Sequence, residues 1–270
     1  ITAQSPPADD FHYLAVLARL TGPLPSNAMP SLAHAILSLD RKWQGRQNHD
    51  LLQWKDRFPE VVLPLLRREP SLAVALLKDP NFVSPSHVFL ASLFGAAHYQ
   101  TAARQFLAEV KRNPKFGWTG PLVDMLGALP DAEIRPMLRQ QWSKAGLRDD
   151  LLLALANPTE PIDREIFLAG LSSLQPRVVR ASLAALAALP ASATGKGLAP
   201  ALLLLRRLLY EPAEQATRAQ VLSLIERETG QSFRVRDTAG HPEALRAAYQ
   251  PVFDRCARRY PQTERAMNGE

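Results

Sequence analysis

The chain has 270 residues, 46% of them hydrophobic and 21% charged, with 32 lysines and arginines against 26 aspartates and glutamates. A chain of this length and composition buries enough apolar surface to fold as a soluble globular protein without disulfides or a structural metal. The single cysteine, Cys256, excludes an internal disulfide, a thiolate zinc cluster and a C-x-x-C redox pair. No apolar run reaches the roughly 18 residues that span a bilayer, which excludes an integral membrane protein.

Apolar residues recur at three- and four-residue spacing along nearly the whole chain, whereas alternating, strand-like runs are almost absent. Most of the 23 prolines lie between the apolar runs or in the first turn of one, where no hydrogen-bond donor is lost. The pattern predicts an all-α fold of short helices. The helices predicted in chain order cover residues 8–20, 29–44, 49–57, 60–68, 71–78, 86–93, 99–112, 120–128, 131–144, 149–156, 163–171, 177–188, 198–210, 213–229 and 242–259.

Two stretches of the chain match each other at a constant offset of 45 residues, within the ~40–47 residues of HEAT and armadillo repeats. In each copy an apolar helix is followed by a turn with Pro130 or Pro176, and the next helix opens with an apolar residue and then Arg135 or Arg180. We therefore predict a HEAT-like α-α superhelix (solenoid), with an irregular α-bundle as the alternative. The matched pairs are Leu122 and Phe167, Leu126 and Leu171, Leu129 and Leu174, Ile134 and Val179, Arg135 and Arg180, and Leu138 and Leu183.

The second copy, residues 175–186, resembles the second helix of a HEAT repeat, in which proline opens the helix, valine and leucine face the stack, and alanine allows close approach. The resemblance implies that Arg180 bonds across the turn to a neighbouring repeat. Because stacked repeats form one continuous core, we predict a single domain over residues 1–270.

The C-terminal segment, residues 229–270, differs in composition from the rest and is predicted to cap the solenoid. Gly230 has the position of a glycine that stops a helix, and a polar segment with a short extended piece at 232–236 follows it. The last helix has an apolar side that includes Tyr249 and Cys256. We therefore expect Cys256 to be a buried small residue rather than a nucleophile, since no histidine lies near it in sequence.

Candidate catalytic chemistry is sparse. The six histidines occur singly, without the spacing of a metal or haem site, and no nucleophile elbow or catalytic triad is present. We predict no cofactor, no metal and no enzymatic activity in this segment. The acidic residues that begin several predicted helices are explained by the helix dipole.

The net charge of +6 is the feature that favours nucleic acid as a partner. The basic pairs at 67–68, 111–112, 206–207 and 258–259 fall at predicted helix C-termini, where cations offset the dipole, so nucleic acid binding is the alternative rather than the first hypothesis. An enzymatic version is a HEAT-like alkylpurine DNA glycosylase, a family to which Trp118 and Asp124 bear a faint resemblance. Their spacing departs from that family's pattern and Pro121 interrupts it, so packing of Trp118 against the preceding repeat is the competing explanation.

A broader resemblance covers most of the chain. Residues 5–20, 39–42, 147–149, 163–171, 229–233 and 249–253 resemble the HEAT-repeat region of large secreted planctomycete-type proteins. In that family a sugar-dehydrogenase-like β-propeller precedes the helical region and a c-type cytochrome domain with C-x-x-C-H follows it. The resemblance implies a segment of a membrane-bound-dehydrogenase-like protein, and carries over no catalytic residue, because the haem ligands fall outside the residues present.

These observations predict a non-catalytic scaffold or protein-interaction module, excised from a larger secreted redox protein and located in the periplasm or at the cell surface. Its partners would be flanking domains or a protein docked on the concave face. The chain begins at Ile1 without an initiator methionine or a leader, from which we expect a processed protein or a segment of a longer one. A free-standing nucleic acid binder, cytoplasmic if the resemblance fails, is the alternative.

Overall fold

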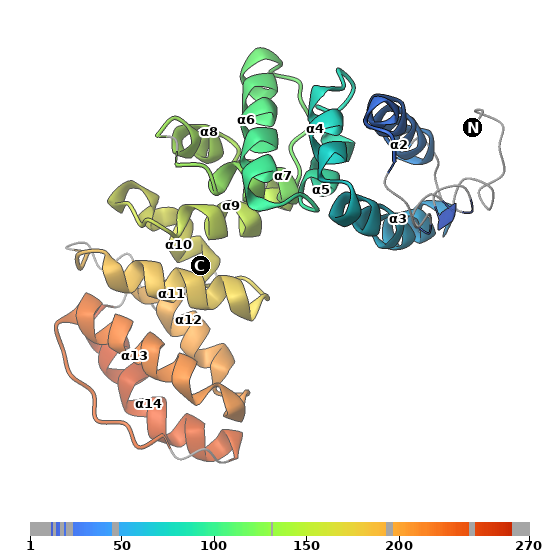
Figure 1. Cartoon of the computed structure of the whole chain (residues 1–270). Helices are drawn as coiled ribbons and strands as arrows, with labels where there is room; N and C mark the ends of the chain where they lie inside the picture. The colour runs from blue at the N-terminus through green and yellow to red at the C-terminus, as the bar shows by residue number, and fades with distance from the viewer. Residues whose placement is uncertain are drawn as a thin grey trace. The chain divides into compact units, whose positions relative to one another are not determined.

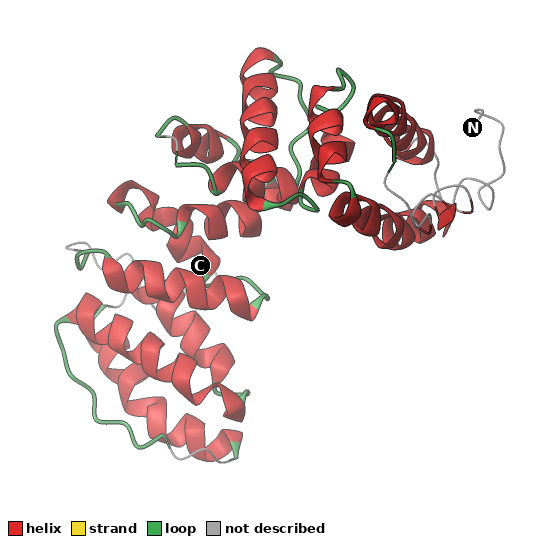
Figure 2. Ribbon diagram, in the orientation of Figure 1, coloured by secondary structure: helices red, strands yellow, loops and turns green. Residues whose placement is uncertain are grey.

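The computed structural model describes residues 24–44, 49–130, 132–192, 197–237 and 241–260, together with the isolated positions 12, 15, 16 and 19. Within these residues the chain forms 13 α-helices and several short 3-10 helices, and no strand (Figure 2). The prediction of an all-α fold is confirmed. The predicted helix at 8–20 lies largely outside the described residues.

The contacts divide the chain into two compact units, Ile1–Met137 and Leu138–Glu270, each of which is described by itself. The prediction of one domain with a cap at 229–270 stays a prediction. Unit 1 contains η1 (Ser26–Ala28), α2 (Met29–Gln44), α3 (His49–Arg68), α4 (Pro70–Lys78), η2 (Pro85–His87), α5 (Val88–Ala91), α6 (Ala96–Arg112) and α7 (Gly120–Gly127), and α8 (Ile134–Gln140) crosses the boundary (Figure 1). Unit 2 contains η3 (Ala145–Leu147), α9 (Arg148–Leu155), η4 (Pro161–Asp163), α10 (Arg164–Gly170), α11 (Pro176–Ala188), α12 (Leu198–Leu208), η5 (Pro212–Glu214), α13 (Gln215–Thr229) and α14 (Pro242–Arg259).

The break predicted between residues 57 and 60 is wrong. The two helices predicted at 49–57 and 60–68 are a single helix, α3, which contains Pro59 and Pro64. An internal proline costs about 3 kcal/mol, but the helix positions Phe58, Val62 and Leu65 along one fully buried stripe, and this burial offsets the cost.

The helix predicted at 131–144 is shorter in the structure, where α8 covers Ile134–Gln140. Pro136 has no backbone N–H, so a helix that began at 131 would lose the hydrogen bond from residue 136 to residue 132. At the other end Gln141 and Trp142 donate to carbonyls three residues back, at 3.0 and 3.1 Å, which turns the chain out of the helix.

The core of unit 1 contains a chain of aromatic rings. Phe82 stacks on Phe94 and meets Phe106 edge to face, each at a centroid distance of 5.7 Å, and Phe106 meets Phe116 at 6.2 Å. These rings come from α6 and from the loops on either side of α5 and after α6. Aromatic pairs of this geometry contribute about 0.5–1.5 kcal/mol each beyond the area that they bury.

In unit 2, the most extensive helix contacts join some neighbours in sequence and some helices one further along. They are α9 with α10 and α11, α10 with α11 and α12, α11 with α13, and α12 with α13. Gly230 ends α13 in the left-handed conformation, with φ of 65°, which confirms the predicted stop.

The last helix, α14, buries the side predicted to be apolar, including Leu245, Tyr249, Val252 and Cys256. The prediction that Cys256 is a buried residue is confirmed, and this burial raises the pKa of its thiol to about 11.

Candidate functional site

Arginine side chains hold the helices of unit 2 at their ends. Arg139 donates from Nε to Asp163 Oδ1 at 2.7 Å and from Nη2 to Asp163 Oδ2 at 3.0 Å, so that one guanidinium binds both oxygens of a fully buried carboxylate. These hydrogen bonds raise the pKa of Arg139 against the opposing effect of burial. Because Asp163 is the last residue of η4, the pair anchors the chain directly before α10.

Arg218 holds the far end of α12 in the same way. Its fully buried guanidinium donates to both oxygens of Asp237, at 2.8 and 3.1 Å, and to the carbonyls of Leu208 and Glu211, at 3.2 and 2.7 Å. Burial opposes the charge on Asp237, but the hydrogen bonds from Arg218 and Tyr249 outweigh it and lower the pKa of the carboxyl. The turn between α12 and α13 is therefore held firmly in place.

Between these anchors, α10 lies very close to two other helices. A Cβ atom added to Gly170 would lie 2.1 Å from Leu152 Cδ1 on α9 and 2.2 Å from Ser182 Oγ on α11. Ser182 is fully buried, and its hydroxyl donates to the carbonyl of Val178 at 2.8 Å. Glycine at this position thus permits α10 to pack between α9 and α11.

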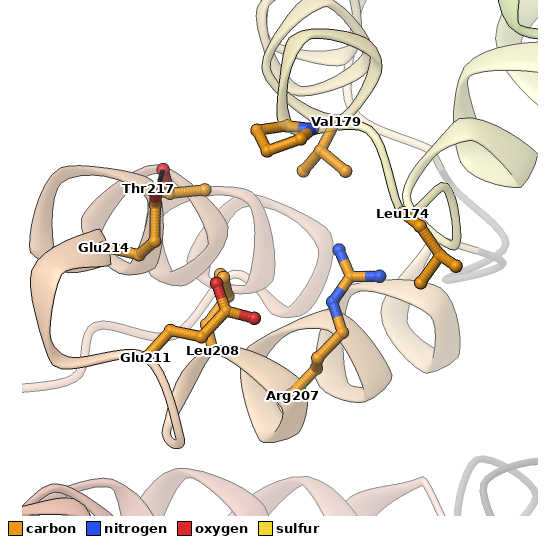
Figure 3. A pocket seen from close by; sticks show the side chains of 8 residues that line it. Leu174, Val179, Arg207, Leu208, Glu211, Glu214 and Thr217 are labelled. Atoms are coloured by element: carbon orange, nitrogen blue, oxygen red, sulfur yellow. Dashed lines mark hydrogen bonds between the residues drawn. The ribbon is translucent and has the colours of Figure 1, made fainter.

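Two hollows share Arg207 as a lining residue. One lies between the start of α11, the end of α12 and the start of α13, and the other lies between α10 and α12. We call them the narrow hollow, of about 90 Å³ (Figure 3), and the wide hollow, of about 530 Å³, and together the α10–α12 groove. The narrow hollow is lined by Leu174, Pro176, Val179, Arg207, Leu208, Glu211, Glu214 and Thr217. The wide hollow is lined by Glu165, Leu168, Ala169, Leu171, Ser172, Pro200, Leu203, Leu204 and Arg207.

The groove leaves large apolar side chains in solvent. Leu174, in the turn after α10, is 88% exposed, and Leu203, on α12, is 42% exposed. Full burial of a leucine contributes roughly 1.5–3 kcal/mol; Leu174 gains little of this stabilisation and Leu203 only part of it. Two exposed leucines beside a hollow with leucine walls make an apolar docking surface.

The narrow hollow carries opposite charges on two sides. The guanidinium of Arg207 donates from Nη1 to the carbonyl of Ser173 at 2.9 Å, near the turn after α10. On the opposite side lie two carboxylates (Figure 3), of which Glu214 accepts from the hydroxyl of Thr217 at 2.5 Å. Among the described residues, the side chain of Glu211 has no hydrogen-bond or ion-pair partner. Within the described parts of the chain, the hollow therefore offers one carboxylate that no cation binds.

Two further hollows are weaker candidates. One of about 460 Å³ lies between α2 and α4, but its carboxylate Asp79 already accepts from His34 Nδ1 at 3.1 Å and from the backbone N–H of Asn81 at 2.8 Å. Burial raises the pKa of Asp79, yet these hydrogen bonds outweigh it and lower the pKa overall. The other, of about 490 Å³, is lined by α6 alone and is not enclosed by a second element.

The predicted repeat residues lie in both units, Pro130 and Arg135 in unit 1 and Pro176 and Arg180 in unit 2. Pro130 is exposed in the turn before α8, and Arg135 is half-buried in the first turn of that helix. Pro176 is the first residue of α11, one position before the predicted start at 177 and in agreement with the resemblance to a HEAT helix, and it also lines the narrow hollow. Arg180 is exposed and makes no hydrogen bond to any described residue; in its place, Arg207 bonds across to the turn between α10 and α11.

Two residues that the repeat alignment pairs differ in exposure. The alignment pairs Leu174 with Leu129, which is 9% exposed, whereas Leu174 is 88% exposed. The turn explains the difference, because the hydroxyl of Ser173 donates to Asp149 at 3.3 Å and accepts from the N–H of Gln175 at 3.1 Å. This local hydrogen bonding takes the chain around the end of α10 with Leu174 on the outside.

Trp118 and Asp124 form the alternative site predicted from the sequence. Trp118 precedes α7, and Asp124 lies within it. Trp118 is half-buried two residues before the helix, and Asp124 is exposed on it. Burial and the nearby charge of Asp124 raise the pKa of Tyr99. Neither candidate lines one of the four hollows described above. The glycosylase hypothesis stays a prediction.

A buried histidine, His87, contacts polar groups in the interior of unit 1. His87 Nδ1 lies 3.0 Å from the carbonyl oxygen of Phe82, and Nε2 lies 3.3 Å from Asp40 Oδ2. Since a carbonyl can only accept, Nδ1 carries a hydrogen in this arrangement. Within the part of the chain that the structure describes, no three histidine, cysteine, aspartate or glutamate side chains are grouped as a metal site would require, and no helix has the length and apolar character needed to cross a membrane.

Comparisons of the chain with protein-family models, with curated proteins and with solved structures gave no match. The described residues define the protein as all-helical, with 13 α-helices. Its function must therefore be argued from the α10–α12 groove and from the chemistry of the residues that line it.

Proposed function

We propose that this chain is a non-catalytic helical scaffold whose α10–α12 groove binds a segment of another protein. The exposure of Leu174 carries the proposal, because this leucine stands 88% exposed beside a hollow whose walls include Val179 and Leu208. Surfaces of this kind, apolar at the centre with charged groups at the edge, are typical of protein–protein interfaces.

The walls of the groove are suited to a partner because they are held rigidly. Arg139 fixes the chain before α10, Arg218 fixes the end of α12, and Gly170 lets α10 pack tightly between its neighbours. A preformed groove loses little conformational entropy when a partner binds, which favours affinity.

We further propose that the helices form a HEAT-like α-α superhelix. The support lies in the contacts of unit 2, in which α9, α11 and α13 contact one another in sequence while α10 contacts α12. Two parallel layers of alternating helices would produce this set of neighbours. In such a scaffold, a groove between successive helices offers an extended surface to a partner.

The origin of the chain in a larger secreted redox protein, periplasmic or attached to the cell surface, remains part of the proposal and rests on the sequence resemblance. Sequencing of the source gene on both sides of the segment tests it. We expect a propeller-like region upstream and a C-x-x-C-H motif downstream. A start codon directly before Ile1 and a stop codon directly after Glu270 would contradict this origin.

The protein-binding function is tested by selecting random displayed peptides on the full chain and measuring their affinity by fluorescence polarisation. We expect selected peptides to lose at least about tenfold in affinity for the double variant Leu174→Asp, Leu203→Asp, because charges would replace the apolar edges of the groove. Ile162→Asp is the matched control, since Ile162 is 72% exposed in the same unit but does not line the groove.

Failure to select any peptide whose binding depends on these leucines would contradict the proposal. Nucleic acid is the competing partner and is tested in parallel with labelled duplex DNA at low and high salt. An affinity for DNA that falls steeply with salt, together with no groove-dependent peptide, would replace protein binding by nucleic acid binding.

A further inference from the structure

We propose that the α10–α12 groove recognises a segment in which an aliphatic or aromatic side chain is closely followed by a lysine or arginine, with the basic head group bound at Glu211 and Glu214. This inference rests on the proposed function and specifies the chemistry of the partner. It follows from the different linings of the two hollows.

The narrow hollow matches the chemistry of a long basic side chain. Its walls are apolar, formed by Leu174, Val179 and Leu208, and one side ends in the carboxylates of Glu211 and Glu214 (Figure 3). Lysine and arginine have the same division, with an apolar stem that packs along hydrocarbon and a charged head that stays at the polar end. The volume of about 90 Å³ is smaller than the ~150 Å³ of a cavity that accepts benzene, so it suits a stem rather than a ring.

The two carboxylates form an acidic spot on a chain whose net charge is +6. Glu214 is partly engaged by the hydroxyl of Thr217, and Glu211 lacks a partner among the described residues. A cation bound in this hollow interacts favourably with both carboxylates. The arrangement thus favours a cationic head group and disfavours acidic peptides and nucleic acid phosphates.

Arg207 does not occupy that position. Its Nη1 donates to the carbonyl of Ser173 at 2.9 Å, which holds the guanidinium on the side of the turn after α10, next to Leu174 and across the hollow from Glu214 (Figure 3). A basic head group from a partner would therefore bind on the side away from Arg207.

The wide hollow accounts for the apolar part of the segment. It is about 530 Å³ in volume, and Leu168, Leu171 and Leu204 line it beside the exposed Leu203. Because Arg207 lines both hollows, a side chain in the wide hollow and one in the narrow hollow belong to neighbouring positions of the same bound segment. The recognised pattern is therefore a large apolar residue with a basic residue within a few positions of it.

The test uses the full chain and the peptides selected on it, synthesised with a fluorescent label. We expect the selected sequences to be enriched in lysine or arginine within about four residues of leucine, isoleucine, phenylalanine or methionine. The double variant Glu211→Gln, Glu214→Gln should bind them about tenfold more weakly, and replacement of the basic residue by glutamine in the peptide should weaken binding to the wild type by a similar factor. When the double glutamine variant is combined with the glutamine-substituted peptide, the affinity should be only slightly lower than with either change alone.

Glu243→Gln is the control for a general charge effect, since the Glu243 side chain is 89% exposed on α14, outside the groove, and it should leave the affinity unchanged. Thermal unfolding by circular dichroism verifies that each variant is folded. Groove-dependent peptides that lack basic residues, or that bind the double glutamine variant as tightly as the wild type, would overturn this inference while leaving protein binding intact. The absence of any peptide sensitive to Leu174 and Leu203 would overturn both.

Discussion

The two copies of the 45-residue match have similar sequences and different surfaces. In the first copy, residues 122–138, the apolar positions are buried throughout, including Leu129 at 9% exposure. In the second, residues 167–183, Phe167, Leu171, Val179 and Leu183 are equally buried, but Leu174 is 88% exposed. A shared pattern thus specifies the common core positions, and the single departure from it marks the edge of the groove.

The surroundings of the two copies differ at a second position, besides the turn that holds Leu174 outside. The position of Gly170 in the second copy is occupied by the buried Met125 in the first. Because Gly170 has no side chain, α10 can pack directly against Leu152 and Ser182. In the first copy, the side chain of the methionine fills the corresponding space. Four substitutions, at Arg139, Gly170, the paired leucines and Tyr249, test how the second copy and unit 2 are held together.

The largest loss of stability is expected when the contact between Arg139 and Asp163 is removed. Replacement of Arg139 by methionine is expected to lower the free energy of unfolding by about 4 kcal/mol, because the fully buried carboxylate of Asp163 loses its bidentate guanidinium. Urea unfolding followed by circular dichroism measures the change. Arg180→Met is the control and should lower the free energy of unfolding by less than about 0.5 kcal/mol, since Arg180 is exposed. A loss this small for the Arg139 variant as well would show that the contact between Arg139 and Asp163 is unimportant for stability.

Close approach in the second copy is tested by Gly170→Ala. The new Cβ would lie 2.1 Å from Leu152 and 2.2 Å from Ser182, so α10 must shift, and we expect a loss of about 3 kcal/mol in the same unfolding measurement. Gly146→Ala, at a position where a Cβ meets nothing within 4 Å, should be nearly neutral. A neutral Gly170→Ala variant would mean that α9, α10 and α11 pack less closely than described.

The paired leucines test the comparison directly. Leu129→Ala should destabilise the protein by about 2–3 kcal/mol through loss of a buried side chain, whereas Leu174→Ala should change stability by less than about 0.5 kcal/mol. Thermal and urea unfolding of the two variants side by side measure the difference. Similar losses would place Leu174 in the core and remove the main support for the groove.

The smallest effect concerns the C-terminal segment that closes unit 2. Tyr249 donates to Asp237 at 2.9 Å, so Tyr249→Phe is expected to cost about 1.5 kcal/mol at pH 8, whereas Tyr210→Phe, at a side chain 59% exposed, should cost almost nothing. Burial, reinforced by Asp237, raises the pKa of Tyr249 to about 12. Its contribution is therefore complete below its ordinary pKa of 10 and is lost as the pH rises through about 12.

Ultraviolet titration of the phenol groups checks this directly. The wild type should show one tyrosine that ionises near pH 12 and that is missing from Tyr249→Phe. If the two titration curves superimpose at high pH, Tyr249 is not buried against Asp237, and the contact that ties α14 to the preceding segment is absent.

The sequence allowed good prediction of local structure. The predicted bounds of α2 and α14 agree with the structure, and Gly230 stops α13 as expected, because helical periodicity and stop signals are local properties of the chain. Local reasoning failed at α3, where it split a helix at Pro59, since it could not weigh the proline against the burial of Phe58 and Val62.

The candidate site was less predictable. The sequence drew attention to Trp118, Asp124 and the arginines that follow Pro130 and Pro176, all of them conspicuous residue types or repeat positions. The groove is built from ordinary leucines and glutamates, and the alignment gave no sign that Leu174 differs from Leu129. The only available signal was the pair Ser172 and Ser173 before Leu174, which favours a turn bonded through its side chains and thus an outward direction for the next residue.

The all-α class, the positions of most helices and the burial of their apolar faces follow from the sequence alone, because apolar residues spaced three and four apart lie on one face of a helix, and that face is buried. Three features depend on the tertiary packing: which leucine is exposed to solvent, which arginine binds which carboxylate, and which two carboxylates line the same hollow. Those outcomes depend on contacts between residues such as Gly170 and Leu152, or Arg139 and Asp163, which lie 18 and 24 positions apart. Only the packed helices set the distances between them, and these distances give the α10–α12 groove its shape and charge.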